Sequence, residues 1–375
     1  MELSYWEKQS YLNDVGLLII GSGIVGLNAA IAYKTKFPKT KVVLAERGLL
    51  PLGASTKNAG FACFGSVSEL ADDLSRIPEN TVWETVKLRN NGLKKLKKLL
   101  GEKNIDYHPL GGFEVFDNKA DFEKYAGLIT SFNAKMQSVL GFKNVYSIVN
   151  KKTDTSGLKG FGYCIKNNFE GQLNTGMMMH SLLALAHKKE ILVLNGLEVG
   201  KIEDVGKTVH KSFKNGLIID SKKVIVATNG FAKQLLPSLD VKPARAQVLV
   251  TSPIKNLKLK GAFHYQQGYY YFRNIDNRIL LGGGRNLDFA KEETTEFGLT
   301  DKVQSKLESL LKENIIPGIP HQIEYRWSGI MGVGSEKRPI IKHISKNVVC
   351  AVRMGGMGVA IGSLVGQIAV DELTK

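Results

Sequence analysis

The feature that most constrains the fold of this 375-residue chain is a glycine-rich turn between a short apolar run and an apolar helix. Residues 17–20 are apolar and lead into Gly21-Ser22-Gly23-Ile24-Val25-Gly26, after which residues 27–33 are again mostly apolar. The first glycine permits a tight turn, the second lets the backbone approach a pyrophosphate, and the third lets the helix pack on the strand. The N–H groups and dipole at the helix start attract phosphates. The order predicts a dinucleotide-binding strand–turn–helix unit made from all six motif residues.

Residues 15–33 form a 19-residue apolar stretch, which is long enough to be mistaken for a membrane span. The stretch contains four glycines and Asn28, and Asp14 stands where a signal peptide would carry basic residues. We therefore predict a buried strand and helix, no transmembrane segment and a cytoplasmic protein.

A second apolar strand is predicted at residues 41–45, and it ends in Glu46, 20 residues after Gly26. An acidic residue at this place accepts hydrogen bonds from the adenosine ribose hydroxyls and repels a 2′-phosphate. Glu46 and the adjacent Arg47 are thus candidate cofactor-binding residues. The motif alone does not choose between NAD and FAD.

Residues 53–61 are dense in small and hydroxyl side chains and follow this second strand. The stretch resembles the D-amino-acid oxidase superfamily of FAD-dependent amine oxidoreductases, which includes glycine oxidase, sarcosine oxidase and gamma-glutamylputrescine oxidoreductase. A glycine- and serine-rich surface loop is the alternative interpretation. The resemblance implies that this stretch wraps the flavin diphosphate and ring through Ala54, Ser55, Thr56, Asn58, Ala59, Gly60 and Phe61.

Later segments extend the resemblance over nearly the whole chain. Glu198-Val199 opens a strand, residues 223–230 read as a strand with a small-residue turn, and residues 327–329 read Trp-Ser-Gly. Arg338-Pro339, another strand and Gly355-Gly356-Met357-Gly358 precede a final helix whose N–H groups would stabilise reduced flavin. The resemblance implies FAD contacts from Val199, Ala227, Thr228, Asn229, Gly230, Gly329, Gly355, Gly356, Met357, Gly358 and Val359.

Residues 240–325 alternate as an antiparallel sheet would, and in this superfamily such a sheet covers the substrate cavity. Tyr271 and Arg273 are our candidates for facing the substrate, although ordinary core packing explains alternating tyrosines equally well. Trp327 and Met331 are further candidates for the pocket. Met331 stands where relatives that oxidise free amino acids often carry an arginine, so the resemblance favours an amine substrate unless Arg273 or Arg285 substitutes.

The predicted fold class is α/β: a Rossmann-type FAD-binding domain, similar to that of glutathione reductase, plus an antiparallel substrate sheet with helices. The FAD-binding domain is expected to be discontinuous and to comprise residues 1–75, 170–240 and 325–375. The substrate domain is expected to comprise residues 76–169 and 241–324.

The resemblance implies oxidation of a C–N bond in a small amine or amino acid, with hydride transfer to flavin N5 and hydrolysis of the resulting imine. We identify no general base, and His264 is the one histidine that merits a test. Leu280 aligns with the oxygen-activating lysine of sarcosine oxidases, so the choice between oxygen and another electron acceptor stays open. Three scattered cysteines predict neither a disulfide framework nor a cysteine-based metal site. We expect noncovalent FAD and no metal.

The formal charge of +16 is compatible with an anionic binding partner. Residues 89–104 hold Arg89 and five lysines at helical spacing with leucines, and a solvated amphipathic face explains this pattern best. Two alternatives remain: oxidation of a modified tRNA side chain, and a non-catalytic flavin-binding subunit of a dehydrogenase complex. Nucleic acid is therefore a less favoured partner than a small amine or amino acid.

Overall fold

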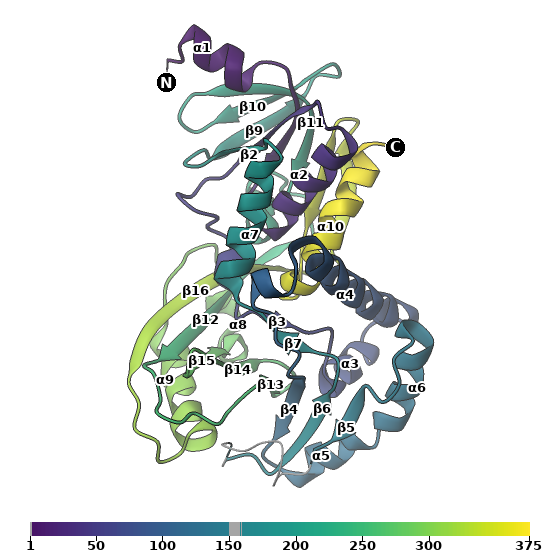
Figure 1. Cartoon of the computed structure of the whole chain (residues 1–375), viewed down its shortest axis with the longest axis vertical. Coiled ribbons are helices and arrows are strands. Elements are labelled where there is room, and N and C mark those ends of the chain that lie inside the picture. Colours follow the sequence, from purple (N-terminus) through teal and green to yellow (C-terminus); the bar gives the residue numbers. More distant parts are fainter. Residues whose placement is uncertain (1, 150–157, 159) are drawn as a thin grey trace.

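A computed structural model describes residues 2–149, 158 and 160–375. Two eight-stranded sheets lie at opposite ends of the molecule, with helices α2, α4, α7 and α10 between or beside them (Figure 1). Within the described part of the chain, no helix combines the length and apolarity needed to span a membrane.

The first sheet has a parallel core built around β1, all six of whose residues are buried. Its centre is continuously apolar because both faces are covered: one packs on α2 and α10, and the other packs on β9, β10 and the segment after β11. Antiparallel strands β9 and β10 extend it beside β11, and antiparallel β17 ends it. Its strands are β1 (Val15–Ile20), β2 (Lys41–Ala45), β8 (Leu192–Leu194), β9 (Val199–Asp204), β10 (Val209–Phe213), β11 (Ile218–Val226), β17 (Ile340–Ser345) and β18 (Val348–Val352).

The second sheet is mainly antiparallel, and among its described strands only β13 and β4 pair in parallel. Asp276 and Asn277 form the tight turn between β14 and β15, both with positive φ, as a type I′ hairpin requires. In spatial order its strands are β16 (Ile323–Val333), β12 (Lys242–Thr251), β15 (Arg278–Gly283), β14 (Tyr270–Ile275), β13 (Ala262–Tyr265), β4 (Gly112–Phe116), β6 (Tyr163–Asn167) and β5 (Tyr146–Ile148).

Helices complete the two halves, and a short ladder of β3 (Phe61–Ala62) with β7 (Gly171–Gln172) lies between them. The N-terminal α1 (Tyr5–Glu7) stands apart from the core, with none of its residues buried. The remaining helices are α2 (Ile24–Lys36), α3 (Val67–Leu74), α4 (Glu79–Leu100), α5 (Lys119–Ala126), α6 (Ile129–Leu140), α7 (Thr175–Lys188), α8 (Phe289–Glu292), α9 (Asp301–Leu310) and α10 (Gly358–Leu373).

Glycines let three helices pack in close contact. A Cβ on Gly366 of α10 would lie 2.7 Å from the Ala29 nitrogen of α2. On the other side of α10, a Cβ on Gly92 of α4 would lie 2.1 Å from the Ala360 oxygen. Ser363 Oγ donates a hydrogen bond to the Gly92 oxygen at 2.6 Å. The final helix is therefore held between α2 and α4.

The structure confirms the predicted α/β fold with a parallel-core sheet and a mainly antiparallel second sheet. The domain division stays a prediction. The boundary expected at residue 325 falls inside β16, which pairs along its length with β12 of the second sheet. Helix α4, expected in the substrate domain, contributes buried residues to the same hydrophobic core as α2 and α10.

Candidate functional site

A cavity of about 590 Å³ is lined by residues of both sheets. On one side its wall is the glycine turn before α2. Gly21 has a φ of +100°, and a Cβ there would lie 2.9 Å from the Ala227 oxygen of the neighbouring β11 turn. A Cβ on Gly26 would lie 1.9 Å from the Gly21 oxygen. Only glycine permits this approach of helix to strand, so the first and third motif glycines have the predicted roles.

Glu46 stands at the end of β2 and is 5% exposed. Its Oε2 accepts hydrogen bonds from the Ser22 nitrogen at 3.1 Å and the Ser22 hydroxyl at 3.0 Å, while Oε1 accepts from the Gly48 nitrogen at 3.0 Å. Oε1 also accepts from the Leu52 nitrogen at 3.4 Å, so the roughly four acceptor positions of the carboxylate are used, and a ribose hydroxyl from the cavity would replace this longest contact. Beside it, the Arg47 guanidinium lies 3.6 Å from the centre of the Phe231 ring.

Residues 53–61 fold as a tight loop against the helix start. Ser55 Oγ accepts a hydrogen bond from the Ile24 nitrogen at 2.9 Å. The Asn58 amide donates to the Ser55 oxygen at 2.8 Å, and its Oδ1 accepts from the Gly60 nitrogen at 2.9 Å and the Thr175 hydroxyl at 2.8 Å. The loop is thus fixed by its own side chains rather than being a mobile surface loop.

The segment before α10 closes the same wall. Gly355 and Gly356 have φ values of +57° and +80°. Asn229 Oδ1 accepts a hydrogen bond from the Met354 nitrogen at 3.1 Å and so ties the turn after β11 to this segment. The N-termini of α2 and α10 both line the cavity, and each presents the positive end of a helix dipole to it.

Most residues predicted to bind the cofactor line the cavity. They are Gly21, Gly23, Ile24, Val25, Glu46, Arg47, Ala54, Ser55, Asn58, Ala59, Phe61, Val199, Ala227, Thr228, Asn229, Gly329, Gly355, Gly356, Met357, Gly358 and Val359.

Five others lie behind the wall: Ser22, Gly26, Thr56, Gly60 and Gly230. Ser22 is fully buried against Glu46, and the Thr56 hydroxyl donates to the Pro51 oxygen at 2.6 Å. A Cβ on Gly230 would lie 2.5 Å from the Met331 oxygen. These residues shape the backbone of the wall and do not themselves face the cavity.

Of the four residues expected in the substrate pocket, Tyr271 and Met331 line the cavity, whereas Arg273 and Trp327 do not. Arg273 is 3% exposed, and its Nη1 donates to the carbonyl oxygens of Ala59, Gly60 and Leu173. The Trp327 indole donates to the Lys57 oxygen at 2.9 Å. Both side chains therefore hold the loop at residues 57–60, and the expected substrate-facing position of Arg273 is corrected.

Sequence reasoning missed several polar residues of the wall, among them Glu69 and Arg89. Arg89 is 5% exposed and does not belong to the solvated face of α4. A signal was present, because Arg89 shares a helix face with Leu93, Leu96 and Leu100, all of which are buried. Glu69 was missed because its place in the sequence is already explained by the capping box that it forms with Ser66 at the start of α3.

The carboxyl groups around this wall differ in ionisation. Burial raises the pKa of Glu114 to about 7 and raises that of Glu170 above its ordinary value. Burial alone would also raise the pKa of Glu69, but the charges of His264 and Lys337 lower it overall. Burial, together with Glu170, holds the pKa of the Cys63 thiol well above its usual range. Of the three carboxyl groups, only Glu69 therefore has a pKa below its ordinary value.

A family model described as DAO, FAD dependent oxidoreductase, matches residues 17–372. No curated protein matches the chain by sequence.

Among solved structures, L-proline dehydrogenase from P. horikoshii is 16% identical, with a TM-score of 0.76 over 96% of this chain and 93% of that chain. Glycine oxidase from Geobacillus kaustophilus is 16% identical, with a TM-score of 0.76 over 96% of this chain and 94% of that chain. Iminodiacetate oxidase from Chelativorans sp. is 18% identical, with a TM-score of 0.74 over 96% and 95%. At these identities the similarity establishes the shared fold.

The buried Glu114 predicts a pH dependence of stability. Its pKa rises from 4.5 to about 7 on folding, so between these values the folded protein binds more protons than the unfolded chain. The free energy of unfolding should therefore fall as pH rises through this window, by up to about 3 kcal/mol. Urea denaturation at pH 5 and pH 7 should show a smaller difference in Glu114→Gln than in the wild type. Glu123→Gln, at an exposed position of α5, is the control, and an unchanged difference in Glu114→Gln contradicts the assignment.

Proposed function

We propose that this chain, which belongs to the DAO family of FAD-dependent oxidoreductases, binds FAD noncovalently and oxidises a C–N bond in a small amino acid or amine. The family resemblance predicted from the glycine-rich segments is thereby confirmed, whereas the substrate and the mode of attachment are our inference. The observation that carries the proposal is one cavity whose wall runs from the glycine turn before α2 to Tyr271, Met331 and the polar residues beside them.

The residues present fit the cofactor. The N-terminus of α2 and the bare backbone at Gly21 and Gly23 suit the pyrophosphate. Glu46 suits the ribose hydroxyls, and the N-terminus of α10 suits the electron-accepting ring. When bound, FAD supplies the two-electron acceptor for the oxidation. Cys164 and Cys350 lie outside the cavity wall, and burial holds the pKa of the Cys63 thiol, which does line the cavity, well above its usual range; this disfavours the thiolate that a covalent link would need.

Arg89 supports a substrate that carries a carboxylate. Its Nη1 donates to the Phe64 oxygen at 3.1 Å, but its buried Nε has no hydrogen-bond partner, and Arg89 forms no ion pair with a described carboxylate. A buried unpaired guanidinium is unfavourable, and a carboxylate in the cavity would satisfy it. Arg89 is therefore a better candidate than Arg273 to replace the arginine that is missing at Met331.

Other side chains of the wall can position the amine. Glu69 is anionic and lines the cavity, so it can hold the substrate ammonium until the proton is lost. Phe61 and Tyr271 line the cavity and pack edge to face with ring centres 5.7 Å apart, which gives this part of the wall an aromatic surface. Burial raises the pKa of Tyr271 to about 12, so its hydroxyl keeps its proton and can donate a hydrogen bond. Leu280 is buried at the position that aligns with the oxygen-activating lysine of sarcosine oxidases. The proposal therefore does not choose between oxygen and another electron acceptor.

The purified protein is expected to be yellow. Its flavin absorbance should bleach when a substrate is added to an anaerobic sample. The panel contains amino acids, the matching amines without a carboxylate, and 2-hydroxy acids. We expect bleaching by one or more amino acids and by no 2-hydroxy acid. Protein that is colourless and cannot be reconstituted with FAD, or flavin that dithionite reduces but no amino acid or amine does, would refute the function.

Gly23→Val should lose FAD. A Cβ at this position would lie 2.7 Å from Ser55 Oγ, and a larger side chain would fill the place where backbone approaches the pyrophosphate. The measurement is flavin absorbance per chain after gel filtration. Gly162→Ala serves as the control, because a Cβ at Gly162 meets no atom within 4 Å. Full flavin content in Gly23→Val would contradict the placement.

Arg89→Met should raise KM for the amino-acid substrate about tenfold or more, because a charge-assisted hydrogen bond is lost. KM for a matching amine without a carboxylate should change little. Arg326→Met is the control, since Arg326 pairs with Glu308 at 2.7 Å outside the cavity wall. Equal losses for the acid and the amine would show that Arg89 supports only the fold.

A further inference from the structure

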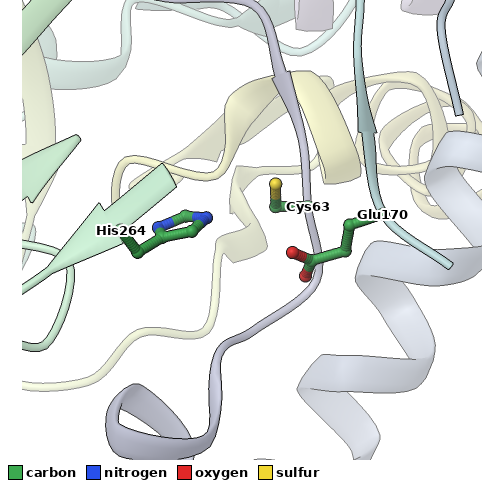
Figure 2. Close-up of side chains that lie close together, drawn as sticks. All are labelled: Cys63, Glu170 and His264. Atoms are coloured by element: carbon green, nitrogen blue, oxygen red, sulfur yellow. The ribbon is translucent and has the colours of Figure 1, made fainter. Parts of the chain in front are cut away.

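Three side chains of types that bind metals lie close together beside β3, although they are far apart in the sequence. Cys63 follows β3, Glu170 precedes β7, and His264 lies in β13 (Figure 2). A sulfur, a carboxylate oxygen and an imidazole nitrogen from the three residues all lie within 4.8 Å of one another. We propose that Cys63, Glu170 and His264 form a binding site for a zinc-like divalent cation, which is an activity separate from amine oxidation.

The three groups are shielded from bulk water, and one of them, His264, has a nitrogen without a hydrogen-bond partner. Cys63 and Glu170 are each 1% exposed and His264 is 8% exposed. The buried Nε2 of His264 has no hydrogen-bond partner. A buried imidazole nitrogen left unpaired costs free energy, and a cation or a donor in the cluster would remove that cost. This unpartnered nitrogen distinguishes the cluster from a chance gathering of polar residues.

Glu170 is already oriented for coordination. Its Oε1 accepts hydrogen bonds from the backbone nitrogens of Phe64 at 2.7 Å and Gly65 at 2.9 Å. Such outer contacts fix the direction of a ligating carboxylate and leave its second oxygen for a metal. The segment that supplies these nitrogens also carries Cys63, so thiol and carboxylate are held by one short piece of chain.

The surroundings favour a cation. Glu69 and Glu114 lie close enough to interact electrostatically with His264, and Glu69 also interacts with Cys63. Arg273 also interacts electrostatically with Cys63 and opposes them, but its guanidinium is engaged with three backbone carbonyls. Coordination would release the thiol proton to solvent, leaving a thiolate bound to the cation.

Ligand chemistry selects the class of ion. One sulfur, one imidazole nitrogen and one carboxylate oxygen are ligands that Zn²⁺ accepts together, with Zn–S of about 2.3 Å and Zn–N of about 2.0–2.1 Å. Tetrahedral coordination at these lengths places ligand atoms about 3.3–3.6 Å from one another, so atoms up to 4.8 Å apart would have to approach by up to about 1.5 Å. Cys63 and His264 line the cavity whereas Glu170 lies behind it, so the fourth coordination position would face the cavity.

The test uses the flavin-loaded full chain after dialysis against a chelator. Equilibrium dialysis with Zn²⁺ should give one ion per chain. Co²⁺ in its place should give the intense visible bands of a four-coordinate ion, at wavelengths beyond the flavin absorption. Cys63→Ser and His264→Gln should each weaken Zn²⁺ binding by about 100-fold or more, because each removes a direct ligand.

Cys350→Ser in β18 and His180→Gln on the exposed face of α7 are matched controls and should bind Zn²⁺ as the wild type does. Flavin content is measured in every variant, so a folding defect or a failure of the proposed function is told apart from loss of the metal site. Absence of stoichiometric Zn²⁺ binding, unchanged binding in Cys63→Ser or His264→Gln, or the weak bands of octahedral Co²⁺ in the wild type would each overturn the proposal. The Co²⁺ spectrum of the wild type decides even where a variant fails to fold.

Discussion

The contact between α2 and α10 is the constraint on which the rest of the structure depends. Glycines at positions 362 and 366 of α10 bring its backbone against α2, where a Cβ on Gly362 would lie 2.6 Å from Ile24 Cγ2. Because the two helices pack so closely, both N-termini reach the wall of one cavity. Two helix dipoles then act on the same space, one from each end of the chain. The first and last segments of the sequence thus form a single binding wall.

Charge is distributed unevenly between the surface and the interior. The chain carries a formal charge of +16, yet the buried region beside the cavity gathers Glu69, Glu114 and Glu170 around one histidine. The lysines of α4 do not line the cavity, and two of them pack over aromatic rings, Lys94 over Phe142 and Lys97 over Tyr107. These three buried glutamates therefore run against the sign of the net charge, whereas the cavity wall itself carries both signs, with Arg89 and Lys337 as well as Glu46 and Glu69.

The parts of the site that the sequence predicted are those whose geometry is local. The turn at residues 21–26 and the loop at residues 53–61 are each made by consecutive residues, so the local sequence pattern is enough to predict their conformation. Arg273 could not be placed in this way, because alternation in a strand does not say which loop covers each face. The meeting of Cys63, Glu170 and His264 depends on the pairing of β3 with β7 and of β13 with β4, which no local pattern encodes. A rule based on cysteine spacing misses such a cluster.

Arg273 also links the two halves of the molecule mechanically. It belongs to β14 of the second sheet, while its three carbonyl partners lie in the loop before β3 and in the segment before α7. A guanidinium buried at this junction is stable only when all three segments have docked, because each missing acceptor leaves a buried donor unpaired. The two sheets therefore gain this stabilisation together or not at all. We expect them to fold and unfold as one cooperative unit, so that neither half persists as an independent fragment after proteolysis.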